Sequence, residues 1–354
     1  MVLGIDASRA NTTMRTGVEQ YAFHIIKALA EQMPAAHVRL YTASPPLSQW
    51  GTLPPTWQWV VLPGRALWSQ WILPQHLRSH SVDCLFIPAS RIPPITGHRV
   101  VATIHDIAFE THPAVYSLGQ RLWQRWVLRD ILRRADAIIV PTNSVANDIA
   151  HRYPQWYSKV NVVAHGPTVA VATETVPKIP ATFLYVGRME KKKNILPFIQ
   201  AIERLAHQGG MDILRCTFVG NAGYGFGALW DAIQRCPRHL TWRGWVNEFE
   251  LQQLRQTSQF MALPSIAEGF GFPVLEAWSN GCVPVVSDCG ALVEVAGDAA
   301  IVLPLGSPEQ WVDVLKNALP PGEHNIVDRG KRRLAQFQWD RAAERTAAVL
   351  KKLL

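Results

Sequence analysis

Residues 264–286 read PSIAEGFGFPVLEAWSNGCVPVV, and the order of residue types in this stretch decides the fold. An apolar run ends at Leu263, two glycines follow in a loop, and Pro273 is suited to the first turn of a helix. Asn280 and Gly281 are typical of a helix end, and the apolar run 283–286 follows at once. The stretch therefore predicts a strand, a glycine loop, a helix and a second strand, which is the repeating unit of a parallel α/β sheet.

Short apolar runs of this kind recur between amphipathic segments through both halves of the chain. They are rich in β-branched and aromatic residues, as expected of strands that are buried on both faces. In the first half they are 2–5, 38–41, 59–62, 84–87, 100–104 and 137–140, and in the second half 183–186, 216–219, 240–242, 260–263, 283–286 and 300–303. Residues 166–181 carry three prolines and little periodicity, which indicates a linker between two α/β domains.

The boundaries that follow are a first Rossmann-like domain over 1–166, a second over 167–337 and a terminal segment over 338–354. A first helix is expected over 17–30, where Tyr21, Ile25 and Leu29 share an apolar face. Residues 339–353 predict an amphipathic helix that packs back across the domain junction.

Length and composition agree with two folded domains. The chain has 354 residues, more than one hydrophobic core usually supports, with 48% hydrophobic and 18% charged residues. No window approaches the roughly 18 apolar residues of a membrane-spanning helix. The first residues lack the basic start and cleavage site of an export signal, so we expect a cytoplasmic location.

Cysteine usage and charge restrict the partners. The five cysteines are an odd number and form no C-x-x-C pair, which predicts reduced, mostly buried thiols and neither a disulfide framework nor a zinc site. The net charge of +8 favours anionic partners, namely nucleotides, phospholipid headgroups or nucleic acid. No helix-turn-helix, RNA-recognition or zinc-finger pattern is present, so nucleic acid is not expected.

The loop after Leu263 has the chemistry of a phosphate site. Glu268 lies beyond the carboxyl end of the strand, and Gly269 and Gly271 let the backbone approach a ligand. A helix start there offers free amides and the positive end of a helix dipole to an anion such as a pyrophosphate. Glu276 lies eight residues after Glu268, within the first turns of the helix, so the two carboxylates are expected to flank that site.

A second basic segment, YVGRMEKKKN at 185–194, follows the first strand of the second domain. Ligands of open α/β sheets bind at this end of the strands. Arg188 and Lys193 are five residues apart in a loop that leads into a helix, so both can converge on one anion. With two fixed cations on a leaving group, no divalent metal is required.

These motifs carry a resemblance to a known family. The pattern E-G-F-G-F-P-x-x-E resembles the E-x7-E signature of the retaining glycosyltransferases of family four, and the resemblance extends over nearly the whole chain. It implies the GT-B fold, in which two Rossmann-like α/β domains face each other across a cleft and a C-terminal helix returns to the N-terminal domain. The first domain would then bind the acceptor, and the second the nucleotide sugar.

The resemblance also assigns roles. Glu268 would contact the hydroxyls of the donor sugar, Glu276 the ribose hydroxyls, and Arg188 and Lys193 the departing diphosphate. The glycine loop at 269–271, with Phe270 inside it, belongs to the donor site. No side chain is an obvious nucleophile, so the implied reaction is front-face displacement with no cofactor and no metal. A glycoside hydrolase also uses a pair of carboxylates, but it would leave the basic loop without an anion to bind.

Further candidate residues rest on the same resemblance. In the first domain, Gly17 matches a glycine whose amide meets the donor, with Thr16 in place of a second glycine. His105, beside Asp106 in TIHDIAFETHP, matches a histidine that touches the transferring sugar or the acceptor. Ser144 would cap a helix, and His165 would lie between the domains. The nucleotide base is expected to rest on Arg243, Gly244 and Trp245.

The chain most resembles bacterial mannosyltransferases of polysaccharide assembly, through HDIAFETHP and SIAEGFGFPVLEAW. GDP-mannose is therefore the favoured donor and a saccharide or lipid-linked molecule the acceptor. The same enzyme type using a UDP-sugar, and a non-catalytic relative that only binds nucleotide sugars, remain open as alternatives.

Residues 117–134 predict a helix on which Leu118, Leu122, Trp126 and Ile131 lie among five arginines. Such a helix suits an anionic membrane at the inner face of the plasma membrane. It equally suits a core-packed helix with a solvated basic face.

Overall fold

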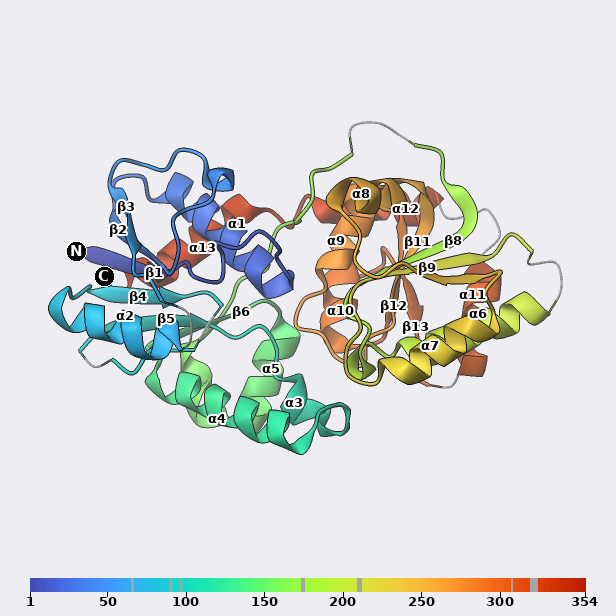
Figure 1. Ribbon diagram of the computed structural model, residues 1–354, viewed down its shortest axis with the longest axis horizontal. Coiled ribbons are helices and arrows are strands. Elements are labelled where there is room, and N and C mark those ends of the chain that lie inside the picture. The colour runs from blue at the N-terminus through green and yellow to red at the C-terminus, as the bar shows by residue number, and fades with distance from the viewer. Residues whose placement is uncertain are drawn as a thin grey trace. The chain divides into compact units, whose positions relative to one another are not determined.

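The computed structural model describes residues 1–64, 67–89, 91–95, 97–172, 176–208, 212–306, 308–318 and 324–354. The chain divides into two compact units, each with its own parallel sheet (Figure 1). Unit 1 consists of Met1–Pro113, Ser117–Thr168 and Phe337–Leu354, and unit 2 of Ala114–Tyr116 and Val169–Gln336. The last segment of the chain thus belongs to unit 1.

Unit 1 is built on seven parallel strands in the order β3-β2-β1-β4-β5-β6-β7. Six of them coincide with the predicted apolar runs, and only the short β7 was not expected. The strands are β1 (Val2–Asp6), β2 (His37–Thr42), β3 (Trp57–Val61), β4 (Cys84–Ile87), β5 (Arg99–Thr103), β6 (Ala137–Val140) and β7 (Val160–Val162). β4 and β6 are buried at every residue, as strands covered on both faces should be.

Side chains cap the beginnings of three helices of unit 1, namely α1, α4 and α5. In α1 the backbone amide of Thr16 donates to Glu19, and in α4 Ser117 and Gln120 form a reciprocal capping box. The helices are α1 (Gly17–Gln32), α2 (Trp68–Ser79), α3 (Ala108–Thr111), α4 (Leu118–Arg134), α5 (Asn143–Arg152) and α13 (Trp339–Lys351), with 3-10 turns at Ser48–Trp50, Pro113–Val115 and Pro154–Lys159. The terminal helix α13 packs against α1, so the predicted return of the chain to the first domain is confirmed.

Unit 2 has six parallel strands in the order β10-β9-β8-β11-β12-β13. They are β8 (Ile179–Val186), β9 (Arg215–Val219), β10 (Leu240–Trp242), β11 (Ser258–Leu263), β12 (Val283–Ser287) and β13 (Ile301–Leu303). The helices are α6 (Ile195–His207), α7 (Phe226–Arg235), α8 (Glu248–Thr257), α9 (Phe272–Ser279), α10 (Gly290–Ala296), α11 (Pro308–Ala318) and α12 (His324–Leu334), with a 3-10 turn at Lys191–Lys193. Each strand was predicted from its apolar run.

The linker is shorter than predicted. Residues 179–181 of the expected linker belong to β8, because the amide of Ala181 donates to the side chain of Gln259 and β8 pairs with β11 from Ile179 onward. Residues 173–175, at the centre of the expected linker, lie outside the described residues.

Two expectations from composition can be compared with the structure. All five cysteines are buried, free thiols, as predicted. In the described ranges, no helix has the length and apolar character required to cross a bilayer.

Candidate functional site

The strand order of unit 2 reverses between β8 and β11, which pair directly with each other. Ligands of open parallel sheets bind outside the carboxyl ends of the strands at this point of reversal. β8 leads into the basic loop that contains Arg188 and Lys193, and β11 leads into the loop that contains Glu268. The amide of Ile266 donates to the carbonyl of Lys192 at 3.0 Å, so the two predicted segments are bonded to each other.

The basic loop is held by its backbone. The amides of Met189 and Lys191 donate to the carbonyls of Asn221 and Tyr224 at 2.9 and 3.1 Å, in the loop after β9. This close approach requires glycine at 220, where a Cβ atom would lie 2.0 Å from the carbonyl oxygen of Gly187. The loop therefore keeps a fixed path.

Lys193 and Glu268 form an ion pair at the centre of this arrangement. The Nζ of Lys193 lies 2.6 Å from Oε1 of Glu268, and Ser265 Oγ donates to the same oxygen at 2.7 Å. Burial alone would raise the pKa of the Glu268 carboxyl. The charges of Lys193 and Lys192, with the hydrogen bonds from Lys193 and Ser265, nevertheless hold that pKa below its ordinary value, so the carboxylate is ionised at neutral pH.

The glycine loop leads directly into α9. Gly271 precedes the helix with φ of +100°, and a Cβ atom there would lie 2.5 Å from Cδ2 of Leu292. Both observations require glycine at this position. The predicted donor residue Phe270 is buried, with its ring packed edge-on against Phe272 at 5.4 Å, so it supports the loop from inside.

Glu276 is buried on α9 and bonded to a residue that the sequence reasoning missed. Nη2 of Arg255 donates to Oε2 of Glu276 at 3.0 Å, and Nη1 of Arg255 donates to Glu248 at 2.8 Å. The sequence feature that could have indicated this contact is the spacing of Glu248 and Arg255, which lie seven residues apart on one face of a helix. In the polar sequence ELQQLRQT, however, a buried arginine cannot be told from a solvated one.

Arg188 differs from Lys193 in being open to solvent. Its side chain is 67% exposed, and its Nε lies 4.0 Å from the carboxylate of Glu190. The Tyr185 hydroxyl donates to the backbone carbonyl of Arg188 at 3.0 Å, which fixes the backbone and leaves the guanidinium free to reach a ligand.

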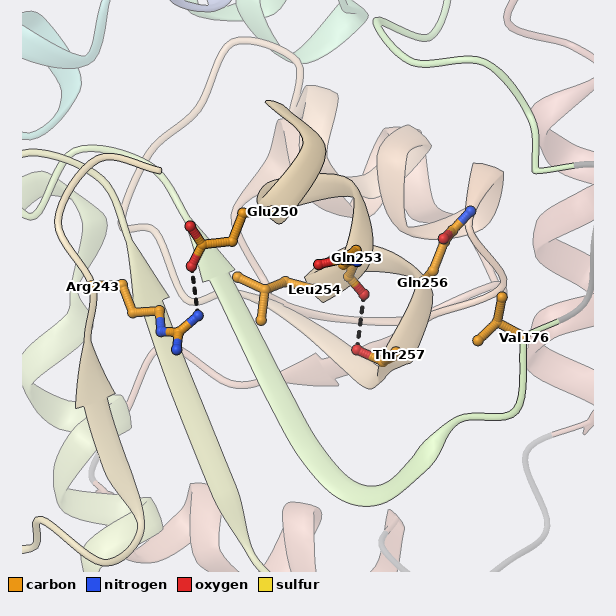
Figure 2. A pocket seen from close by; sticks show the side chains of 7 residues that line it. All are labelled: Val176, Arg243, Glu250, Gln253, Leu254, Gln256 and Thr257. Atoms are coloured by element: carbon orange, nitrogen blue, oxygen red, sulfur yellow. Dashed lines mark hydrogen bonds and ion pairs between the residues drawn. The ribbon is translucent and has the colours of Figure 1, made fainter. Parts of the chain in front are cut away.

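The predicted base platform lies at the end of β10. Gly244 has φ of +64°, and its carbonyl accepts from the amide of Gly220 at 2.7 Å. Trp245 is 61% exposed. Arg243 instead points to Glu250 of α8 at 2.5 Å, and both line a surface hollow of about 460 Å³ (Figure 2). Leu254 and Val176 line the same hollow. The Arg243 side chain is therefore directed towards α8, where it pairs with Glu250.

In unit 1, His105 follows β5 and is held by the loop after β4. Its Nε2 lies 2.9 Å from the carbonyl oxygen of Pro88, and its ring meets that of Tyr21 edge-on at 5.0 Å. Burial lowers the pKa of His105, so the imidazole is neutral at pH 7. Asp106 accepts from the amide of Ala108 at 3.0 Å, which makes it a residue that shapes the loop.

Gly17 is the first residue of α1, but a carboxylate already occupies that helix start. Glu19 is buried, accepts from the amide of Thr16 at 2.9 Å and pairs with Arg9 at 2.5 Å. A ligand anion near Gly17 would therefore meet a negative charge as well as the helix dipole.

Two secondary expectations for unit 1 are wrong. Thr142, and not Ser144, caps α5, because the Thr142 hydroxyl accepts from the amide of Val145 at 3.3 Å. His165 does not lie between the domains: it is 1% exposed inside unit 1, where its ring contacts those of Tyr21 and Trp339 at 4.3 and 5.9 Å.

Two family models match the chain, one in each unit. The model described as "Glycosyltransferase Family 4" matches residues 15–169, and that described as "Glycosyl transferases group 1" matches residues 180–320. The chain belongs to the family-four glycosyltransferases. Between them the two matches cover every predicted catalytic residue of this glycosyltransferase.

Known proteins agree with this assignment. O-antigen chain mannosyltransferase B of Escherichia coli is 27% identical over 274 residues, which are 72% of this chain and 71% of that protein. Among solved structures, WaaG, a glycosyltransferase involved in lipopolysaccharide biosynthesis, matches with a TM-score of 0.72 at 16% identity over 99% of both chains. HepE of Anabaena, in complex with UDP-glucose, matches with a TM-score of 0.73 at 15% identity over 99% of both chains. The predicted GT-B class is thereby confirmed for this glycosyltransferase.

Proposed function

We propose that this glycosyltransferase moves a hexose, with mannose from GDP-mannose favoured, to a saccharide or lipid-linked acceptor in surface polysaccharide biosynthesis, with retention of the anomeric configuration. The observation that carries the proposal is the ion pair of Lys193 and Glu268 at the point where the strand order reverses. In the proposal, Lys193 is the cation for the diphosphate, and the ionised Glu268 beside it accepts hydrogen bonds from the sugar hydroxyls, near the glycine that precedes α9.

The proposed chemistry assigns each group one task. The bond between the anomeric carbon and the diphosphate oxygen breaks, while Lys193 and Arg188 stabilise the charge that develops on the diphosphate. The acceptor oxygen bonds to the anomeric carbon from the same side, and its proton passes to the leaving phosphate. Glu268 orients the sugar through its hydroxyls. We propose that no metal takes part, so transfer should persist in the presence of EDTA.

The identity of the donor rests on the relatives. The E. coli protein similar to this chain is an O-antigen chain mannosyltransferase, which favours mannose. The HepE structure holds UDP-glucose on the same fold, so a UDP-sugar is the alternative donor.

The first test is thermal stabilisation by GDP, GDP-mannose, UDP and UDP-sugars, because a ligand that binds only the folded state raises the unfolding temperature. We expect GDP and GDP-mannose to stabilise the protein and Lys193→Ala to reduce the effect. Lys316→Ala, an exposed lysine on α11 of the same unit, is the matched control and should respond as the wild type does. Stabilisation by UDP compounds alone would show that the donor is a UDP-sugar and not GDP-mannose.

Turnover separates a transferase from a binding protein. With donor and acceptor present, Glu268→Gln should lower kcat about a hundredfold, since it removes the charge that orients the sugar. Product configuration is read by NMR at the anomeric carbon, where inversion would contradict the retaining course. Nucleotide binding without transfer to any saccharide or lipid-linked acceptor would favour the non-catalytic alternative.

We also propose that the beginning of α4 rests on the anionic cytoplasmic leaflet. Leu118, Leu122 and Trp126 are 70%, 56% and 52% exposed, whereas Ile131, predicted to share their face, is buried in unit 1. Trp123 stacks on Trp126 at 5.3 Å. Aromatic and aliphatic side chains at the start of a helix with arginines behind them suit a membrane interface.

Vesicle sedimentation tests this surface. The wild type should sediment with phosphatidylglycerol vesicles and less with phosphatidylcholine vesicles, and Trp123→Ser with Trp126→Ser should weaken both. Binding of the double variant to the vesicles that equals that of the wild type would show that α4 does not contact the bilayer.

A further inference from the structure

Arg255 is a buried cation between two carboxylates. Its side chain is 5% exposed on α8, with Glu248 at 2.8 Å on the solvent side and Glu276 at 3.0 Å on α9. Glu248 is 73% exposed, and Glu276 only 11%. The guanidinium therefore gives the buried carboxylate of Glu276 a partner of opposite charge and fixes one of its oxygens by a directed hydrogen bond.

The contact between α8 and α9 does not depend on this ion pair. Gln252 on α8 donates to the side chain of Asn280, at the end of α9, at 2.8 Å. Lys178 donates to the carbonyls of Gln256 and Asn280 at 2.7 and 2.6 Å, and so joins the carboxyl ends of both helices. Buried ion pairs contribute little net stability compared with apolar residues of the same volume. A role in packing alone therefore does not explain why two charges are buried here.

We propose that Arg255 is a positioning residue for the donor, which holds the carboxylate of Glu276 in the orientation that accepts hydrogen bonds from the ribose hydroxyls of the nucleotide. This inference rests on the proposed function, together with the role at the ribose that the family resemblance implies for Glu276. Without Arg255, Oε2 of Glu276 loses its 3.0 Å hydrogen bond from α8, and a carboxylate that is no longer held in this orientation accepts the ribose hydroxyls poorly. The consequence is confined to the ribose, because Lys193 and Glu268 lie in other loops.

The test compares a nucleoside diphosphate with its 2′,3′-dideoxy form. GDP and UDP are both titrated into the full chain by calorimetry, and the one that binds is used with its dideoxy analogue. The wild type should bind the natural nucleotide about tenfold or more tightly than the analogue, the value of a hydrogen bond to a charged group. In Arg255→Gln this preference should fall to about twofold or less, with the affinity for the analogue unchanged.

Two further variants separate positioning from folding. Arg255→Lys keeps the charge but offers one point of contact in place of a fork, so it should restore part of the preference. Gln252→Leu removes the hydrogen bond between Gln252 and Asn280 and should keep the full preference for ribose even if the unfolding temperature falls. The double variant Arg255→Gln with Glu276→Gln should prefer the natural nucleotide over its dideoxy analogue no less than Glu276→Gln alone does.

The outcomes distinguish this inference from the proposed function. Equal losses for the natural nucleotide and its analogue in Arg255→Gln, or an unchanged preference, would overturn the positioning role. A wild type that binds both ligands equally well would overturn it too, while leaving nucleotide binding in place. A wild type that binds neither ligand would refute the proposed function, and this inference with it.

Discussion

Replacing His24 by glutamine should remove much of the acid sensitivity of unit 1. His24 lies on α1, and its ring stacks on Trp339 of α13 with centroids 5.2 Å apart and planes 11° from parallel. Burial, followed by the charges of Arg15 and Lys27, lowers the pKa of His24 from 6.5 to about 4. Protonation of His24 would therefore place a charge in this partly buried contact between α1 and α13.

The sign and size follow from proton linkage. Below pH 6.5 the unfolded chain binds a proton at His24 while the folded chain does not, so stability falls as the pH falls. The stabilising contribution of the neutral His24 is complete above pH 6.5 and is lost progressively as the pH drops to about 4. At about 1.4 kcal/mol per pH unit, the loss reaches about 3 kcal/mol by pH 4. His105 and His165, whose pKa values burial also lowers, add in the same direction.

Urea unfolding, followed by tryptophan fluorescence at pH 7 and pH 4, measures this contribution of His24 to the free energy of unfolding. Carboxylates titrate in every variant, so the relevant quantity is the difference between variant and wild type. His24→Gln should lose about 3 kcal/mol less than the wild type on acidification. His151→Gln, at an exposed position on α5, should follow the wild type. Equal acid losses in His24→Gln and the wild type would refute the argument.

Four further variants test individual positions. Gly271→Ala should abolish stabilisation by the donor nucleotide, since φ of +100° and the contact with Leu292 leave no room for a Cβ atom; an unchanged thermal shift would contradict this. Thr142→Ala should cost about 1 kcal/mol of unfolding free energy through the lost cap, and Ser144→Ala less, as measured by denaturant midpoints. Lys178→Met should lower the unfolding temperature by roughly 2–4 °C, because it leaves carbonyls at two helix ends without their cation; a stabilised variant would show that burial of the lysine costs more than its bonds return.

The sheets were predictable because each strand is a short apolar run between turn residues. Cys84–Ile87 and Ala137–Val140 were predicted to the residue, since a strand buried on both faces must be apolar throughout. β7 was missed because Val160–Val162 is three residues long and only partly buried. α2 was not predicted, and Pro74 inside it interrupts the helical pattern.

The site was predictable as a set of residues but not as a set of contacts. Glu268 and Lys193 follow from motif and position. Their ion pair joins residues 75 positions apart in the chain, beside the backbone bond between Ile266 and Lys192, and neither contact leaves a mark in either motif. Ser144 failed as a cap because Thr142, two residues earlier, competes with the same chemistry. Arg255 was missed because burial of a charged residue is decided by tertiary packing.

The return of α13 to unit 1 affects the order in which the chain acquires its structure. Residues 1–168 leave the ribosome with the imidazole of His165 and the ring of Tyr21 still lacking the indole that covers them. That indole, Trp339, is synthesised only after the whole of unit 2, about 10–30 seconds later at ordinary rates of translation. During this interval the first sheet is complete in its strands but open along α1. The second unit therefore folds beside an unfinished neighbour, and the last turns of the chain close the first.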